Sequence, residues 1–152
     1  MRLIIAAVGR VRDGPSQALY REYARRATWP LALKEVEERR KLSPARRIEA
    51  ESRLLAAAVP EGAVIVALDQ RGKSLSSEDF AARLGRWRDD GVGDVAFVIG
   101  GADGLDPSWR QRASLVLSLG AMTWPHLLAR VMLAEQLYRA QSILAGHPYH
   151  RA

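Results

Sequence analysis

Many apolar residues of this chain form short continuous runs. Between these runs, the apolar residues recur at the spacing that places them on one face of a helix. A short, unbroken apolar run rich in Val, Ile and Leu is typical of a strand buried on both faces of a parallel sheet. Five such runs predict strands at residues 1–8, 31–38, 63–68, 95–99 and 115–119. The second run is the weakest, because its apolar residues only partly alternate with polar ones.

The intervening stretches carry helix signals. Leu19, Tyr23 and Ala27 recur at four-residue spacing, as on one face of a helix. Ser43-Pro44 reads as a helix cap followed by proline in the first turn, and Ser76 with Asp79 as a second cap. The predicted helices cover residues 15–27, 44–59, 77–89, a short segment after 107, and 127–145. The segments 69–74 and 120–126 are predicted to be loops, and 147–152 a tail.

Strands that alternate with helices at this spacing predict an α/β fold with a mainly parallel sheet flanked by helices, formed by one domain over residues 1–152. In such sheets ligands bind at the carboxyl ends of the strands. Three predicted loops occupy that position, after Leu68, after Ile99 and after Leu119. We therefore expect the ligand site where these three loops meet.

Composition removes several classes of function. The chain has no cysteine, which excludes disulfides, thiolate metal sites and a cysteine nucleophile. Its three histidines lack an accompanying acidic cluster, so no metal site is expected, and no serine forms an evident nucleophile elbow. No apolar run approaches the roughly 20 residues of a membrane span, and the first ten residues read as a strand, not as a signal peptide. A soluble, cytoplasmic protein without a membrane partner is expected.

The net charge of +6 is unevenly distributed. Residues 1–53 hold 13 Lys and Arg against 7 Asp and Glu, whereas residues 54–152 hold 10 of each. Twenty of the 23 basic residues are Arg, which suits bidentate phosphate contact. The first third of the chain could therefore form a face for a polyanion, although solvated helix faces in an Arg-rich protein explain the charge equally well.

The glycine cluster after residue 99 is the first candidate for binding chemistry. Gly100, Gly101 and Gly104 allow positive φ and close approach of backbone N–H groups to a ligand. The spacing is neither a dinucleotide fingerprint nor a P-loop, and taken alone a tight turn is the default interpretation. Group transfer from an activated donor remains open, because it needs a pocket and in-line geometry but no metal and no covalent intermediate.

An ordered set of segments then resembles one known family over essentially the whole chain. These segments are Leu68-Asp69 with Gly72-Lys73, 98–105 (VIGGADGL), 122–126 (MTWPH), Arg130-Val131, 134–140 (AEQLYRA) and 147–151 (HPYHR). Together they are similar to the ribosomal RNA large subunit methyltransferase H family, a minimal branch of the SPOUT methyltransferases. Ala102-Asp103 and Trp124 are mild departures, which do not touch the expected chemistry.

The resemblance implies a deep trefoil knot within about residues 65–150, a homodimer, and S-adenosylmethionine as the cofactor. It implies methylation of N3 of a pseudouridine in 23S rRNA, on the assembled ribosome. The positions that match the family's cofactor site belong to the same three loops that the sheet argument selects. They are Leu68, Gly100, Gly101, Leu119, Gly120, Ala121, Met122, Thr123 and Trp124.

The attacking imide nitrogen must lose its proton, and histidine has a suitable pKa for that step. The candidates are His150 in the tail, which is preferred, and His126, which could also simply cap the loop. Tyr149 can stack on a base. Of the two arginines on the long helix, Arg139 is expected to pair with Glu135, and Arg130 to neutralise a phosphate or the imide anion.

Basic residues in the first third of the chain, with Arg151 in the tail, are expected to contact RNA phosphates without reading sequence. They are Arg21, Arg25, Arg26, Arg46, Arg47 and Arg151. Two alternatives remain open. One is a related knotted methyltransferase that acts on tRNA, and the other is a ribosome-binding factor that keeps the fold without activity. A flavodoxin-like nucleotide module is a more distant possibility.

Overall fold

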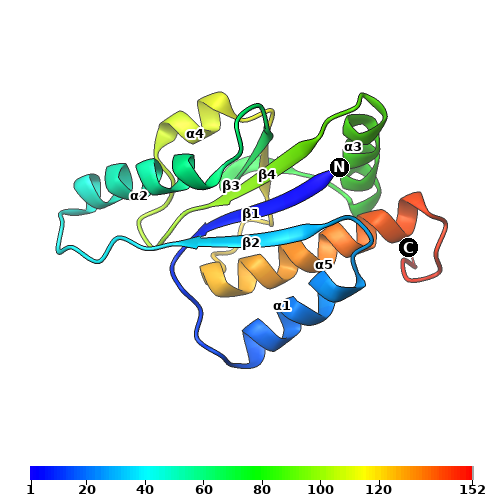
Figure 1. Ribbon diagram of the computed structural model, residues 1–152, viewed down its shortest axis with the longest axis horizontal. Helices are drawn as coiled ribbons and strands as arrows, with labels where there is room; N and C mark the ends of the chain where they lie inside the picture. Colours follow the sequence, from blue (N-terminus) through cyan, green and yellow to red (C-terminus); the bar gives the residue numbers. More distant parts are fainter. Residues whose placement is uncertain (152) are drawn as a thin grey trace.

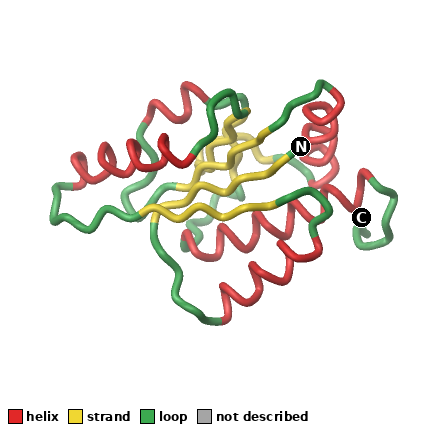
Figure 2. Tube along the Cα trace, in the orientation of Figure 1, coloured by secondary structure: helices red, strands yellow, loops and turns green. Residues whose placement is uncertain are grey.

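A computed structural model describes residues 1–151, in which strands and helices alternate along the chain (Figures 1 and 2). The strands are β1 (Arg2–Val8), β2 (Leu31–Val36), β3 (Val64–Ser74), β4 (Asp94–Ile99) and β5 (Leu115–Ser118). The helices are α1 (Pro15–Arg26), α2 (Pro44–Ala58), α3 (Ser77–Asp89), α4 (Pro107–Arg112) and α5 (His126–Leu144). Every predicted strand and helix is present, which confirms the predicted alternation.

All strand pairs are parallel, and the strands lie in the order β2-β1-β4-β3-β5. Helices cover both faces of the sheet. On one face α5 packs against both α1 and α3, and the other face carries α2 and α4 (Figure 1). The predicted α/β fold with a parallel sheet is confirmed. The carboxyl ends of the strands lie together at one end of the molecule, and the N-terminus lies near the other end (Figure 1).

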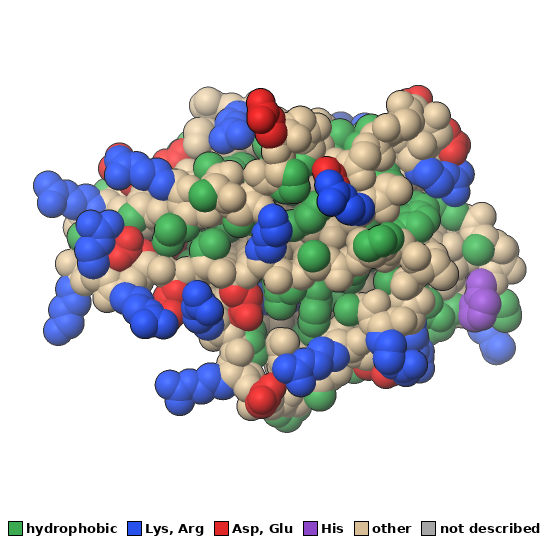
Figure 3. All heavy atoms as spheres, in the orientation of Figure 1, with side chains coloured by type: hydrophobic (Ala, Val, Ile, Leu, Met, Phe, Trp, Pro, Cys, Tyr) green, Lys and Arg blue, Asp and Glu red, His purple; other side chains and the backbone are tan. Residues whose placement is uncertain are grey.

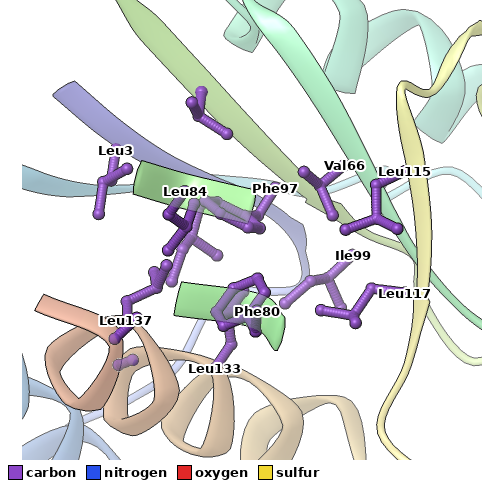
Figure 4. Close-up of a cluster of buried hydrophobic side chains, with 14 of the residues drawn as sticks. Leu3, Val66, Phe80, Leu84, Phe97, Ile99, Leu115, Leu117, Leu133 and Leu137 are labelled. Atoms are coloured by element: carbon purple, nitrogen blue, oxygen red, sulfur yellow. The ribbon is translucent and has the colours of Figure 1, made fainter. Parts of the chain in front are cut away.

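The alternation of side chains along β1 divides the core into two clusters. Leu3 and Ile5 belong to the cluster on the α1, α3 and α5 side, and Figure 4 shows Leu3, Phe80 and Leu133 within this cluster. Residues one position along, such as Ala6, point to the α2 and α4 side. Because both faces of the central strands are buried, their sequences read as continuous apolar runs.

The prediction of a loop over residues 69–74 is wrong. This segment continues β3 to Ser74, and the pairing with β5 shifts register between Leu68 and Lys73. A Cβ atom on Gly72 would lie 2.5 Å from the carbonyl oxygen of Val116, so this close approach of two strands requires glycine. The segment was misread because Gln70, Arg71 and Lys73 give it no apolar pattern.

In the described part of the chain, no helix is long and apolar enough to cross a membrane. The last residue of the predicted tail, 152, lies outside the described residues. The trefoil knot that the resemblance implies stays a prediction.

Candidate functional site: a glycine-lined cleft

A cleft of about 910 Å³ opens at the carboxyl ends of β3, β4 and β5, where the sheet argument placed the ligand site. All the predicted cofactor positions line it except Ala121, which is exposed between two lining residues. The lining members are Leu68, Gly100, Gly101, Leu119, Gly120, Met122, Thr123 and Trp124. The fold therefore brings together residues that are more than fifty positions apart in the sequence.

The glycine loop after β4 forms a tight turn with little space inside it. The N–H of Gly104 donates to the carbonyl of Gly101 at 3.0 Å, and Gly104 adopts a φ of +86°. A Cβ atom on Gly100 would lie 2.7 Å from the carbonyl carbon of Gly104. Closure of this turn therefore requires glycine at position 100, and Gly100 and Gly101 both line the cleft.

A buried carboxyl group lies behind this turn. Glu51 on α2 is 6% exposed, and its Oε2 atom has no hydrogen-bond partner among the described residues. Burial, together with the charge of Asp103, raises the pKa of Glu51. A Cβ atom on Gly101 would lie 3.2 Å from this oxygen, so α2 supports the loop at short range. Arg47 adds an ion pair to Asp103 at 3.4 Å.

Hydrogen bonds fix the loop after β5, which forms another wall of the cleft. Gly120, with a φ of +111°, donates its N–H to the hydroxyl of Ser118 at 3.1 Å. The indole N–H of Trp124 donates to the carbonyl of Leu119 at 3.2 Å, and Gln70 donates to the hydroxyl of Thr123 at 3.0 Å. The last bond uses the extension of β3 that the sequence did not predict. A backbone held in this way can present its N–H and carbonyl groups to a heterocycle.

His126 begins α5 and lines the cleft beside this loop. One turn later Arg130 is almost fully buried, with 2% of its side chain exposed. Arg130 donates to the carbonyls of Val8 and Gly9, both at 2.6 Å, and forms an ion pair with Glu35 at 2.9 Å. Its guanidinium group therefore ties α5 to the ends of β1 and β2. This buried position differs from the contact with a phosphate or an imide anion that the sequence suggested.

The tail folds back on the middle and second half of the same helix. Tyr149 donates its hydroxyl proton to Glu135 at 3.0 Å and packs on Tyr138, with ring centroids 4.6 Å apart. His150 lies between Arg139, which donates to Nδ1 at 3.2 Å, and Glu78, 2.8 Å from Nε2. The predicted pairing of Arg139 with Glu135 is confirmed.

The tail and the cleft of one chain are far apart. The tail contacts Glu135 and Arg139, which follow His126 by 9 and 13 residues, or about 14 and 20 Å along the axis of α5. His126 lies at the cleft, whereas neither Tyr149 nor His150 lines it. The structure therefore does not bring Tyr149 and His150 to the cleft of their own chain.

A family model described as predicted SPOUT methyltransferase matches residues 1–150 of this chain. Proteins named ribosomal RNA large subunit methyltransferase H match over the full length. The relative from Rhodospirillum centenum is 61% identical over 100% of both chains, and the relative from Paramagnetospirillum magneticum is 58% identical over 99% of both. The chain belongs to this SPOUT methyltransferase family.

Solved structures show the same fold at low sequence identity. A probable methyltransferase from Bordetella pertussis aligns with a TM-score of 0.58 at 18% identity, over 91% of this chain and 95% of that one. A probable methylase family protein from Haemophilus influenzae aligns with a TM-score of 0.56 at 13% identity, over 99% and 70% of the chains. These likenesses agree with the SPOUT family assignment at the level of fold.

Basic residues of this SPOUT methyltransferase are spread over the surface, and several of them lie at the cleft end of the molecule. Figure 3 shows Lys and Arg side chains over the end that carries the β2–α2 loop, with acidic groups between them. Arg46 is exposed and forms no ion pair among the described residues, whereas Arg47 pairs with Asp103. On α1, Arg21 pairs with Asp13, and Arg25 and Arg26 both pair with Glu22. The α1 arginines are therefore partly neutralised, and Arg151 is exposed in the tail.

Sequence reasoning missed several residues of the cleft. Ile48 and Arg110 line it, and Arg110 forms an ion pair with Asp69 at 3.0 Å. Ile48 lies on α2 and Arg110 on α4. These helices come to lie over the strand ends only when the chain folds, so the local sequence does not reveal their position. The sequence signal that could have found Arg110 is its position shortly after the glycine loop. Among the described residues, no group of His, Asp and Glu is arranged to hold a metal ion.

Proposed function

We propose that this chain is an S-adenosylmethionine-dependent methyltransferase that methylates N3 of a pseudouridine in 23S rRNA, as a single SPOUT domain in a cytoplasmic homodimer acting on the assembled ribosome. The observation that carries the proposal is the cleft formed by the second half of β3 and the loops that follow β4 and β5. The names of the full-length relatives, which refer to ribosomal RNA of the large subunit, support the substrate class.

The residues of the cleft fit this cofactor. Gly100 and Gly101 would contact the cofactor through their backbone, and the hydrogen-bonded loop from Leu119 to Trp124 would offer it polar backbone groups. Leu68 and Met122 supply apolar contact for the adenine ring. When bound, the cofactor supplies a methyl group activated on a sulfonium. The protein's part is to hold it in line with the acceptor nitrogen.

Tyr149 and His150 would complete the acceptor site of the partner subunit in a homodimer. Their contacts with Glu135 and Arg139 hold both residues outside the cleft of their own chain, so we assign them to the cleft of the partner. Tyr149 would stack on a base, and His150 and Arg151 would contact the acceptor nucleotide. Arg130 would contribute indirectly, because it fixes the cleft end of α5.

A mixed dimer tests this arrangement. One subunit carries Gly100→Ala, which damages the cleft, and the other carries Tyr149→Ala with His150→Ala, which damages the tail. If the tail acts on the partner's cleft, the mixed dimer contains one intact composite site and regains up to about half of the parent activity. Each variant alone forms a homodimer without an intact site. A mixed dimer as inactive as both homodimers would contradict a tail that acts in trans.

The basic end of the molecule would bind rRNA phosphates. Replacing Arg46 and Arg47 with Gln should weaken binding to ribosomes and lower the slope of log K against log salt by roughly 1 to 2, because up to two phosphate contacts are lost. Arg2→Gln is the matched control, since Arg2 is paired with Asp94 at the opposite end of β1. Sedimentation binding at several salt concentrations measures both slopes. Equal slopes for the parent and the double variant would show that Arg46 and Arg47 do not contact RNA phosphates.

Deletion of the gene tests the substrate assignment in the cell. Mass spectrometry of 23S rRNA from the deletion strain should show loss of one methyl group on a pseudouridine, and the wild-type gene should restore it. A gene carrying Gly100→Ala should fail to restore it. Loss of a methyl group from tRNA, with 23S rRNA unchanged, would instead support the tRNA alternative. Unchanged RNA of every class would support a ribosome-binding factor without activity.

A further inference from the structure

We propose that His126, at the beginning of α5, is the group that accepts the N3 proton of the acceptor base. This inference rests on the function proposed above and assigns a proton acceptor within it. The cleft of each chain then contains its own base, while the partner's tail serves to bind and orient the nucleotide.

The position of His126 suits this role. Its side chain lines the cleft together with the loop from Leu119 to Trp124, where the cofactor is proposed to bind. Its Nε2 atom faces the end of β1, where a Cβ atom on Gly9 would lie 3.3 Å away. No hydrogen bond occupies either ring nitrogen among the described residues. The imidazole is therefore free to take a hydrogen bond from a substrate N–H.

The surroundings of His126 favour its neutral form. Partial burial and the positive charge of Arg130 lower the pKa of His126 from its usual value. The N-terminal end of α5 adds a partial positive charge that acts in the same direction. The carboxylate of Glu35 on β2 is paired with Arg130, and the hydroxyl of Tyr20 on α1 is held neutral by burial, which raises its pKa to about 12. At neutral pH the imidazole is thus ready to accept a proton.

His150 is less suited to the same role in this structure. Both of its ring nitrogens are engaged, one by Arg139 and the other by Glu78. Nδ1 accepts from Arg139 and Nε2 lies against the carboxylate of Glu78, so neither nitrogen is open to a substrate N–H. The tail histidine that the sequence favoured is better placed to bind the nucleotide than to deprotonate it.

The proposed step is balanced. The N3–H proton moves to the unprotonated ring nitrogen of His126. The electron pair left on N3 forms the new bond to the methyl carbon. The bond between that carbon and the sulfonium sulfur breaks, with its electrons passing to sulfur, which becomes a neutral thioether. The imidazolium then releases its proton to water, and no oxidant or reductant takes part.

The pH dependence of methyl transfer to ribosomes tests the assignment. For the parent enzyme kcat/KM should rise with pH through a midpoint below 6.5 and then level off, because the lowered pKa of His126 leaves the base neutral above that midpoint. His126→Gln should lower kcat by roughly 100-fold or more and remove this rise. Its affinity for S-adenosylmethionine, measured by calorimetry, should stay within about twofold of the parent.

Two further variants separate the histidines. His150→Gln and His147→Gln should both keep the acidic rise in the profile, even where His150→Gln lowers the rate. Added imidazole should partly restore His126→Ala, which a purely structural role would not allow. Loss of the rise in His150→Gln, or a parent-like profile in His126→Gln, would overturn the proposal. Failure of the proposed function looks different, since the parent enzyme itself would then methylate no rRNA.

Discussion

Gly100→Ala is expected to lower the affinity for S-adenosylmethionine by at least about tenfold, equivalent to about 1.4 kcal/mol, and methyl transfer by more. The added Cβ atom would lie 2.7 Å from the carbonyl carbon and 2.8 Å from the carbonyl oxygen of Gly104, and 2.9 Å from the nitrogen of Leu105. These are backbone atoms, which cannot move aside as the end of a flexible side chain can. The turn must open, and the cleft wall that it forms moves with it.

Gly93→Ala is the matched control for this variant. Gly93 lies just before β4, whereas Gly100 follows it, and an added Cβ atom there would meet nothing within 4 Å. Calorimetric titration with the cofactor and with its demethylated product should show parent-like affinity for Gly93→Ala and weakened affinity for Gly100→Ala. Thermal unfolding of both variants checks that the fold is retained. Parent-like cofactor affinity of Gly100→Ala would show that the glycine turn is not part of the cofactor site.

Arg130→Met is expected to lower the free energy of unfolding by about 3–5 kcal/mol, because it breaks a buried ion pair from one side. Glu35 would keep its charge without its partner, and the carbonyls of Val8 and Gly9 would lose their donor. Urea denaturation followed by circular dichroism measures the loss. Adding Glu35→Gln should recover part of it, since the remaining uncompensated charge is then removed.

Arg139→Met provides the comparison for this loss. Arg139 forms an ion pair on the same helix, with Glu135, but 23% of its side chain is exposed. Solvent screens that pair, so its removal should cost only about 1 kcal/mol or less. If Arg130→Met were no more destabilising than Arg139→Met, the buried cluster would not hold α5 to the ends of β1 and β2.

The sequence predicted the sheet because its central strands are buried on both faces and therefore read as unbroken apolar runs. It also predicted which three segments meet at the cleft, because parallel strands place their carboxyl ends at one edge, although one of these segments is a strand and not a loop. The polar extension of β3 was missed because nothing in its residue pattern distinguishes an exposed strand from a loop. Gly72 was the one available signal, and a glycine alone also fits a turn.

The roles of polar side chains were harder to predict than the backbone. Arg130 looks like a surface residue in the sequence, yet it is buried because three acceptors from β1 and β2 converge on it. Glu51 is buried because α2 packs directly on the glycine turn. Such contacts join residues tens of positions apart, and no local spacing reveals them. The distance between the tail and the cleft likewise follows only from the course of α5.

Transfer of labelled methyl groups from S-adenosylmethionine to purified RNA acceptors tests the central claim most directly. Intact ribosomes, free 23S rRNA and tRNA are offered in parallel, with acceptors from a strain that lacks the gene. We expect label in the 23S rRNA of intact ribosomes, at a single pseudouridine, and none in tRNA or with Gly100→Ala. Label in tRNA alone, or no label in any RNA despite normal cofactor binding, would contradict the proposed function.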